Sequence, residues 1–166
     1  ADHYHHFKED IALMAEMGFK TYRFSISWSR VLPQGTGKIN PKGIEFYNQL
    51  IDECLKYNII PFVTMFHFDM PAALDEKGGW SCPESVEWFL EYARVLFKNF
   101  GDRVKYWLTI NEQNMLTLAG QVIGALHLPK GCTNEMKEIY QQNHYMLVAQ
   151  AKVMSLCHDM NPDAKI

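Results

Sequence analysis

The sequence predicts an α/β fold, namely a partial (β/α)8 TIM barrel that comprises about units 2 to 4. The predicted elements are a helix followed by three repeats of strand, loop and helix, an alternation typical of parallel sheets. The expected strand ends Trp28, His67 and Glu112 are separated by 39 and 45 residues, which is the size of a barrel repeat. A doubly wound sheet is the alternative, but no glycine-rich phosphate loop follows any of these strands.

The three strands are predicted at about residues 20–28, 59–67 and 104–112. The first alternates aromatic or aliphatic residues with Arg23, Ser25 and Ser27, so it has one apolar and one polar face. The second and third are almost continuously apolar and rich in β-branched and aromatic residues. Such runs are typical of parallel strands that are covered on both faces.

Helical spacing of apolar residues connects the strands. Asn40 is the expected N-cap of the helix that begins with Pro41, because proline suits the first turn. Ser81 and Glu84 have the spacing of a capping box before a helix that Gly101 ends. The helices are expected at about 8–18, 41–55, 82–100 and 133–159.

The composition indicates a globular protein, with 48% hydrophobic and 13% aromatic residues among 166. The net charge is −3, and no apolar run approaches the roughly 18 residues of a membrane helix, so neither nucleic acid nor a membrane is an expected partner. Four widely spaced cysteines without a CxxC pair predict a reduced, cytoplasmic chain without structural zinc. Ala1 in place of a methionine, and a strand-like start at residues 164–166, predict a piece of a longer protein.

Polar side chains follow the predicted strands at their carboxyl ends, where a barrel keeps its chemistry. His67 and Asp69 follow the second strand, and Asn111 and Glu112 follow the third. A carboxylate in this position suits glycoside hydrolysis, in which two carboxyl groups cooperate. The simpler interpretation is that Glu112 only begins a solvated loop, since charge is common at strand ends.

Two further groups of side chains could take part in binding. Arg23 lies on the inward or semi-buried face of the first strand and would need a carboxylate or several carbonyls there; alternatively it extends to solvent at a sheet edge. His3, His5 and His6 beside Asp2 lack a second ligand set of fixed spacing, so no metal site is predicted.

Six short motifs in their order resemble glycoside hydrolase family 1 and cover residues 1 to about 125. The motifs are Asp2–His5, Lys8–Ile11, Tyr22–Arg30, His67–Pro71, Gly78–Trp80 and Thr109–Glu112. The resemblance implies that residues 1–166 are a fragment of a single glycoside hydrolase (β/α)8 barrel domain. It implies a retaining β-glycosidase with no cofactor, in which Glu112 is the general acid/base. Asn111 and His67 would bind sugar hydroxyls, and Arg23 would support the nucleophile.

The resemblance also bears on the substrate. Phe68, in place of the tryptophan usual in glucosidases of non-phosphorylated sugars, and the run from Asn111 to Asn114 look most like the 6-phospho-β-glucosidases. The expected partner is therefore a phosphorylated β-glucoside, and a homo-oligomer is compatible with the sequence. The family's nucleophile and phosphate-binding loop would lie beyond Ile166, so the 166-residue piece alone is expected to be inactive. The alternatives are a 6-phospho-β-galactosidase, a plain β-glucosidase, or a catalytically silent sugar-binding or scaffold fragment.

Overall fold

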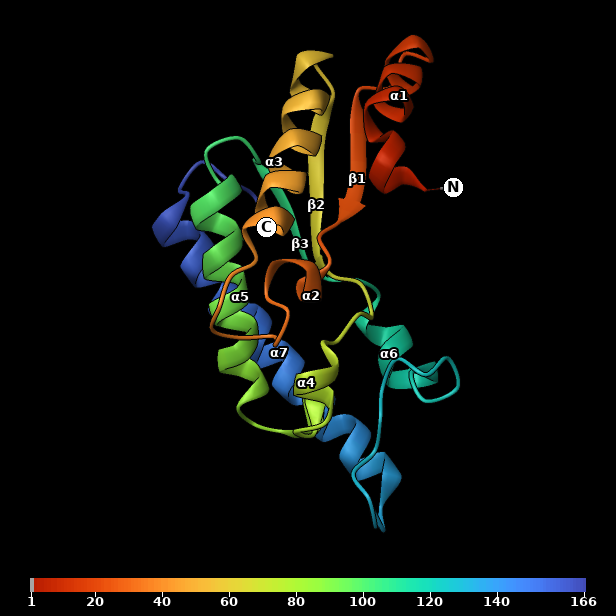
Figure 1. Ribbon diagram of the computed structural model, residues 1–166. Coiled ribbons are helices and arrows are strands. Elements are labelled where there is room, and N and C mark those ends of the chain that lie inside the picture. Colours follow the sequence, from red (N-terminus) through yellow and green to blue (C-terminus); the bar gives the residue numbers. More distant parts are fainter. Residues whose placement is uncertain (1) are drawn as a thin grey trace.

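The computed structural model describes residues 2–166 and contains one parallel sheet with the strand order β1-β2-β3 (Figure 1). The strands are β1, Thr21–Ser25, β2, Ile60–Phe66, and β3, Tyr106–Ile110. In the sheet register, Phe62 lies between Arg23 and Tyr106. Because parallel strands need a long return connection, each strand is followed by helical chain before the next one begins.

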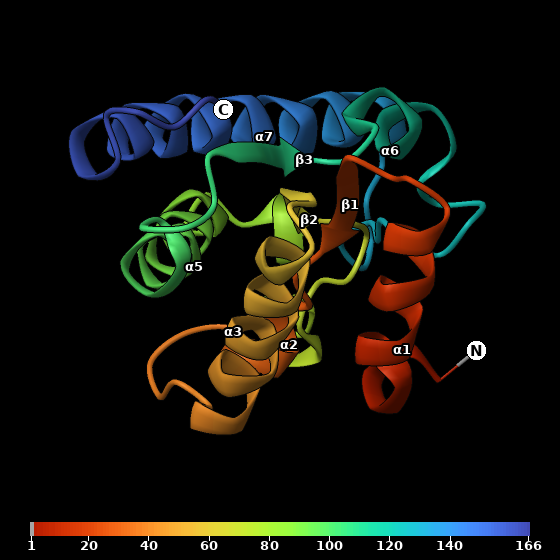
Figure 2. The same ribbon diagram turned by 90° about the horizontal axis from the view of Figure 1, so that it is seen from above.

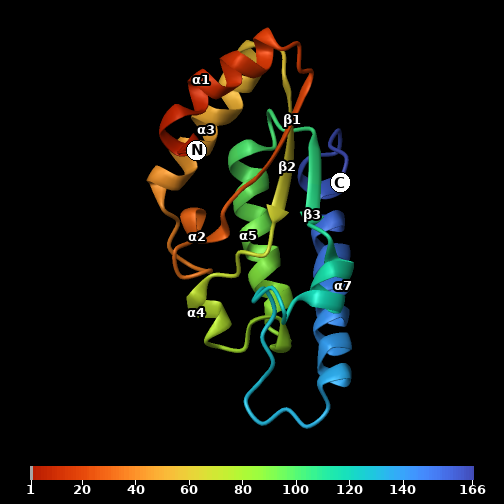
Figure 3. The ribbon, with the colours of Figure 1, turned by 90° about the vertical axis from the view of Figure 1, so that its right-hand side faces the viewer.

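One side of the sheet is covered by the helices α3, α5 and α7 (Figure 2). The first helix, α1, packs against α3, and α5 packs extensively against α7. The short helices α2, α4 and α6 lie beyond the carboxyl ends of the strands (Figure 3). The helices are α1 His3–Glu16, α2 Trp28–Val31, α3 Pro41–Lys56, α4 Ala72–Asp75, α5 Ser85–Phe100, α6 Gln113–Ala119 and α7 Glu135–Met160, with a 3-10 turn η1 at Gly79–Ser81.

This arrangement confirms the predicted partial barrel, with three consecutive strand and helix units. The C-terminal residues also bear out the expected strand-like start, because Tyr106 and Lys165 form an isolated parallel bridge. The N–H of Trp107 donates to the Lys165 carbonyl over 2.9 Å, and the N–H of Lys165 donates to the Lys105 carbonyl over 2.8 Å. The outer edge of β3 therefore already has a partner at this point.

The first strand is shorter than predicted, and Trp28 begins α2 instead of ending the strand. The backbone N–H of Ile26 still donates to the Thr64 carbonyl. The next N–H, of Ser27, donates to the Tyr47 hydroxyl over 2.8 Å, and that of Trp28 donates to the Asp69 carboxylate over 3.1 Å. Side-chain acceptors thus replace the strand ladder, and β1 ends.

Local capping motifs had mixed outcomes. Asn40 caps α3 as predicted, since its side chain accepts from the N–H of Lys42. The capping box at Ser81 and Glu84 is wrong: α5 begins at Ser85, and Glu84 makes no side-chain cap bond. The Ser81 hydroxyl instead accepts from Gln142 of α7 over 2.7 Å. The tertiary contact with Gln142 therefore uses the Ser81 hydroxyl that the capping box would need.

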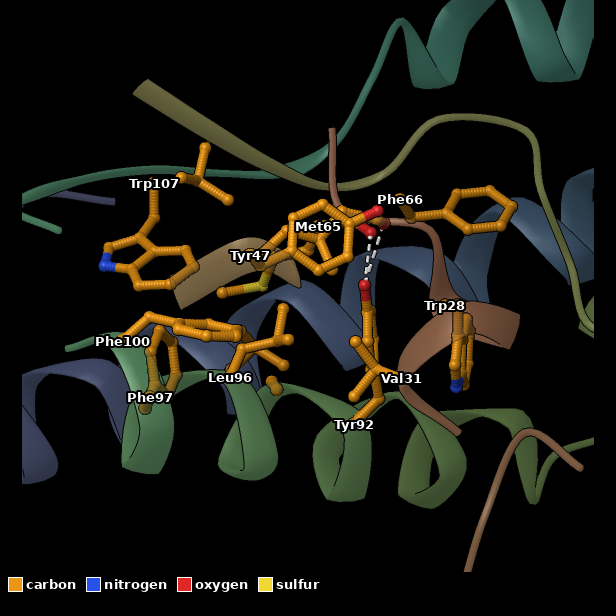
Figure 4. Close-up of a cluster of buried hydrophobic side chains, with 14 of the residues drawn as sticks. Trp28, Val31, Tyr47, Met65, Phe66, Tyr92, Leu96, Phe97, Phe100 and Trp107 are labelled. Carbon is orange, nitrogen blue, oxygen red and sulfur yellow. Dashed lines mark hydrogen bonds between the residues drawn. The ribbon is translucent and has the colours of Figure 1, made fainter. Parts of the chain in front are cut away.

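The core lies between the sheet and α5, where aromatic rings pack against one another (Figure 4). Trp28 stacks on Tyr92 with ring centroids 4.8 Å apart and planes 7° from parallel. Trp107 of β3 meets Phe97 edge to face at 5.2 Å. Burial of each such side chain stabilises the fold by about 1.5–3 kcal/mol. Among residues 2–166, no helix has the length and apolar character needed to cross a membrane.

The buried hydroxyl of Tyr92 joins the exits of two strands (Figure 4). Its oxygen lies 2.9 Å from the Ile26 carbonyl and 3.1 Å from the Met65 carbonyl. Complete burial raises the pKa of Tyr92 well above its ordinary value, because the ionised phenol would lose its hydration. The neutral hydroxyl therefore remains the donor to both carbonyls.

We expect Tyr92→Phe to lower the free energy of unfolding by about 1–2 kcal/mol, because two buried carbonyls lose their donor. The wild-type protein should also lose stability as the pH rises above about 10, since only the unfolded chain then ionises this tyrosine. Tyr92→Phe should remove that part of the pH dependence. Chemical denaturation between pH 7 and 10.5 measures both effects. Tyr140→Phe, at an exposed position on α7, is the control, and equal behaviour of the two variants would contradict the prediction.

Candidate functional site

Three of the four predicted site residues lie at the carboxyl edge of the sheet, and the fourth, Arg23, lies within a strand. Arg23 lies on β1, His67 directly follows β2, and Asn111 and Glu112 directly follow β3. Arg23 and His67 line one cavity of about 430 Å³ together with Thr64, and His3, Tyr22, Phe24 and Ser25 complete its lining. Glu112 does not line this cavity, but it leaves the sheet at the same edge as His67.

Arg23 connects β1 to the tip of β3. Its Nη2 donates to Oδ1 of Asn111 over 2.5 Å, and its Nε donates to the hydroxyl of Thr64 over 3.1 Å. Asn111 is buried with 6% exposure, so this hydrogen bond satisfies an amide oxygen that water cannot reach freely. The contact brings two of the four predicted residues together across the whole width of the sheet.

The expected burial of Arg23 is not found, because the residue is exposed. The reason is its face of the sheet: Arg23 is in register with the partly buried Phe62 and Tyr106, opposite to the helix-covered face. Within residues 2–166, no carboxylate lies at ion-pair distance from its guanidinium. One side of the guanidinium thus holds Asn111 and Thr64, and the other faces open space.

Two backbone positions at the strand exits are strained. Phe68 has φ of +68° and Glu112 has φ of +41°, which is the left-handed region that side chains other than glycine rarely adopt. Such a residue costs roughly 1–2 kcal/mol and persists only where its surroundings fix it. Both strained residues are next to a predicted sugar-binding residue, His67 or Asn111.

Asp69 fixes the first of these bends. Its Oδ1 accepts from the backbone N–H of His67 over 3.2 Å, and its Oδ2 accepts from the N–H of Trp28 over 3.1 Å. Burial raises the pKa of the Asp69 carboxyl, and these hydrogen bonds oppose the shift. One carboxylate thereby joins the loops that leave β1 and β2, and it sets the direction in which His67 leaves its strand.

Sequence reasoning assigned no role to Asp69. The available signal was its position two residues after His67, from which a short carboxylate can accept from a nearby backbone N–H. The second partner, Trp28, is 41 residues away in the sequence, and no local pattern indicates that contact.

Glu112 occupies the N-cap position of α6, but its side chain makes no capping hydrogen bond. Its backbone carbonyl accepts from the N–H of Met115 over 2.8 Å, so the main chain alone begins the helix. The residue is exposed. The preceding residue is held to the sheet, since the N–H of Asn111 donates to the Phe66 carbonyl over 2.9 Å. The carboxylate is therefore on a fixed backbone and free of structural partners in the cap.

The histidines near the N-terminus pair with neighbouring carboxylates, and His5 and His6 both lie at ion-pair distance from Asp2. His5 is 2.8 Å from Asp2, and His6 is 3.2 Å from Glu9. In the part of the chain that the structure describes, no three His, Cys, Asp or Glu side chains converge to hold a metal ion.

We expect Asp69→Ala to lower the free energy of unfolding by about 1–3 kcal/mol, because the N–H groups of His67 and Trp28 lose their acceptor. The raised pKa makes the contribution of Asp69 largest at pH values below the ordinary 3.8, and it declines as the pH rises through the folded-state pKa. The difference between wild type and variant should therefore shrink from pH 4 to pH 7. Thermal unfolding across this range is the measurement, with the exposed Asp102→Ala as control; a constant or growing difference would count against this account.

Comparison with known proteins places this geometry in a family. The family model described as glycosyl hydrolase family 1 matches residues 1–166. The 1,4-beta-D-glucan glucohydrolase of Thermotoga neapolitana is 48% identical over an alignment 168 residues long, gaps included, which covers 99% of this chain and 38% of that protein. The aryl-phospho-beta-D-glucosidase BglC of Bacillus subtilis is 49% identical over 166 residues, covering 99% of this chain and 34% of that protein.

A solved structure has the same fold. The β-glucosidase of Thermotoga maritima in complex with castanospermine superposes with a TM-score of 0.91 at 47% identity, over 99% of this chain and 37% of that one. The chain therefore spans well under half the length of the proteins it matches. The match over the whole sequence and the shared fold lead to one conclusion: the chain belongs to glycosyl hydrolase family 1.

Proposed function

We propose that residues 1–166 form part of the active site of a retaining β-glycosidase in which Glu112 is the general acid/base. The observation that carries this proposal is the pair Asn111 and Glu112 at the carboxyl end of β3, on a fixed backbone and at the same edge of the sheet as His67. Membership of glycosyl hydrolase family 1 supports it. A carboxyl group at this edge of a barrel can reach a substrate in the mouth.

The proposed reaction has two steps. In the first, protonated Glu112 donates its proton to the glycosidic oxygen while a second carboxylate attacks the anomeric carbon and forms a glycosyl ester. In the second, Glu112 as carboxylate accepts a proton from water while the water oxygen attacks the anomeric carbon, which breaks the ester bond and releases the second carboxylate. The second carboxylate would come from outside residues 1–166. No metal or organic cofactor enters this scheme.

The other residues would hold the sugar and the attacking group. Because Oδ1 of Asn111 accepts from Arg23, its Nδ2 is directed elsewhere and can donate to a sugar hydroxyl. The exposed imidazole of His67 can donate to a second hydroxyl from the neighbouring strand exit. The open side of the Arg23 guanidinium could pair with the nucleophilic carboxylate, which would keep that group ionised.

For the substrate we propose a 6-phospho-β-glucoside, and for the location the cytoplasm. The run from Asn111 to Asn114 and Phe68 support the phosphorylated sugar, and four free cysteines fit a reducing compartment. The two relatives described above differ in their substrates and are almost equally similar, so a plain β-glucosidase is the second candidate. A 6-phospho-β-galactosidase and a silent sugar-binding fragment are the others. Rates of the full-length protein on nitrophenyl gluco- and galactosides, with and without the 6-phosphate, separate these candidates.

In the full-length protein, we expect Glu112→Gln to slow glycosides with poor leaving groups by roughly 10²–10⁴-fold, the usual contribution of a positioned acid. A dinitrophenyl glycoside needs little protonation, so its glycosylation step should be spared. The glycosyl ester should then accumulate, because its hydrolysis lacks a base, and added azide should restore turnover. Rates on both substrates and mass spectrometry of the ester measure this.

The exposed Glu135→Gln, at the start of α7, is the matched control and should leave both rates unchanged. Equal losses on the two substrates, with no ester and no rescue by azide, would exclude Glu112 as the acid/base. Unchanged rates on both substrates would mean that Glu112 is a loop residue without a catalytic role.

A purified polypeptide of residues 1–166 should not hydrolyse glycosides appreciably. The proposed chemistry needs two cooperating carboxylates, and loss of one member of a catalytic set typically costs several powers of ten. The measurement is turnover of a dinitrophenyl glycoside by this polypeptide beside the full-length protein. Turnover near the full-length rate would refute the assignment of the nucleophile to another part of the protein.

A further inference from the structure

A row of amide side chains on α7 faces the end of β3 and the start of α6. Asn143 and Gln150 are seven residues apart, which places them on the same face of the helix. That face also carries the buried residues Met146 and Val153. Polar side chains within such an apolar face need hydrogen-bond partners, and both amides have them.

The partners form one continuous line of hydrogen bonds from the sheet to α6. The buried hydroxyl of Thr109, on β3, donates to Oε1 of Gln150 over 2.6 Å. Nε2 of Gln150 donates to Oε1 of Gln113, and Nε2 of Gln113 donates to Oδ1 of Asn143 over 2.7 Å. Each amide in the middle of the line both accepts and donates, so its orientation is fixed.

The line ends beside Glu112. Gln113 is the first residue of α6 and directly follows Glu112, whose backbone has φ of 41° and ψ of 52°. On the other side of Glu112, Asn111 is bound to the sheet and to Arg23. Glu112 thus lies between Asn111, whose side chain is bound to Arg23 of β1, and Gln113, whose side chain is bound to α7. A residue in the left-handed region persists only where its surroundings fix it in this way.

Helix α7 also binds the following turn of α6. Helix α6 is short, and its contacts with α7 include the hydroxyl of Thr117, which lies 3.1 Å from Oδ1 of Asn143. The first and second turns of α6 are therefore held by the same amide of α7. The cap of α6 itself holds Glu112 only through its backbone carbonyl, which accepts from the N–H groups of Met115 and Leu116, because its side chain makes no capping bond.

We propose that Gln150 is a positioning residue, which acts through Gln113 to hold the carboxyl group of Glu112 in the direction required for proton transfer. This inference rests on the proposed acid/base role of Glu112. Gln150 itself does not touch the substrate. It fixes the backbone on which the acid is carried, and a displacement of about 1 Å in such a group can cost as much as 10²-fold in rate.

The test is Gln150→Leu in the full-length protein, which keeps the volume and removes both hydrogen bonds. We expect roughly a 10- to 100-fold lower kcat on a glycoside with an alkyl leaving group. The kcat/KM for a dinitrophenyl glycoside, which reports its glycosylation step and needs little protonation, should change by less than about two-fold. Gln141→Leu, the same substitution at a half-buried position on the same helix, is the control and should be neutral on both substrates.

A double-mutant cycle separates positioning from a general structural role. In a Glu112→Gln background, Gln150→Leu should cause almost no further loss, because the acid that it positions is already absent. Equal losses on both substrates, or a loss that adds in full to that of Glu112→Gln, would overturn the inference while leaving the role of Glu112 intact. If Glu112→Gln itself has no effect, the proposed function fails, and the positioning role fails with it.

Thr109→Val provides a second test on the same line, for the case that Gln150→Leu does not fold. It removes only the first hydrogen bond and keeps the side-chain shape. We expect the rate on the glycoside with the poor leaving group to fall again while the glycosylation step of the dinitrophenyl glycoside is spared, and we expect the fall to be smaller than for Gln150→Leu. Unchanged rates in a folded Thr109→Val variant would show that the line of amides does not position Glu112.

Discussion

The site depends on the parallel register of three strands. Because Arg23, Phe62 and Tyr106 are neighbours across the sheet, the carboxyl ends of all three strands emerge at one edge. Residues that are 88 positions apart in the sequence, Arg23 and Asn111, can then form a hydrogen bond. A slip of one residue in β1 would turn Arg23 to the helix-covered face, where the guanidinium would be buried among aromatic rings.

Anchors outside the strands hold each exit in place. Tyr92 of α5 binds the carbonyls of Ile26 and Met65, and Asp69 binds backbone N–H groups of the same two exits. The third exit is attached to α7 through side-chain amides. In each case a group on a helix or in a partly buried loop binds main-chain or neighbouring atoms, while the side chains of His67 and Glu112 remain exposed. Hydrogen bonds from α5, from α7 and from the loop that carries Asp69 thus fix the positions of the strand exits.

The elements could be predicted from the sequence because apolar periodicity and the polar tips are local signals. The strand ends could not, because the acceptors that end β1, Tyr47 and Asp69, lie 20 and 41 residues away. The capping box at Ser81 failed for the same reason, since Gln142 binds the serine from α7. The candidate acid Glu112 was visible as a carboxylate after a buried strand. The anchors around it were not, because glutamine and threonine within amphipathic elements have no distinctive pattern.

The left-handed backbone at Glu112 has a consequence for the evolution of this protein. Glycine or asparagine adopts φ of 41° with less strain than glutamate, so either residue would relieve part of the cost that the fold now bears. Selection for thermal robustness alone would favour these replacements and would remove the carboxylate. With the proposed acid/base role of Glu112, a glutamate at this position sets activity against stability, and thermostability design of this chain should hold position 112 fixed.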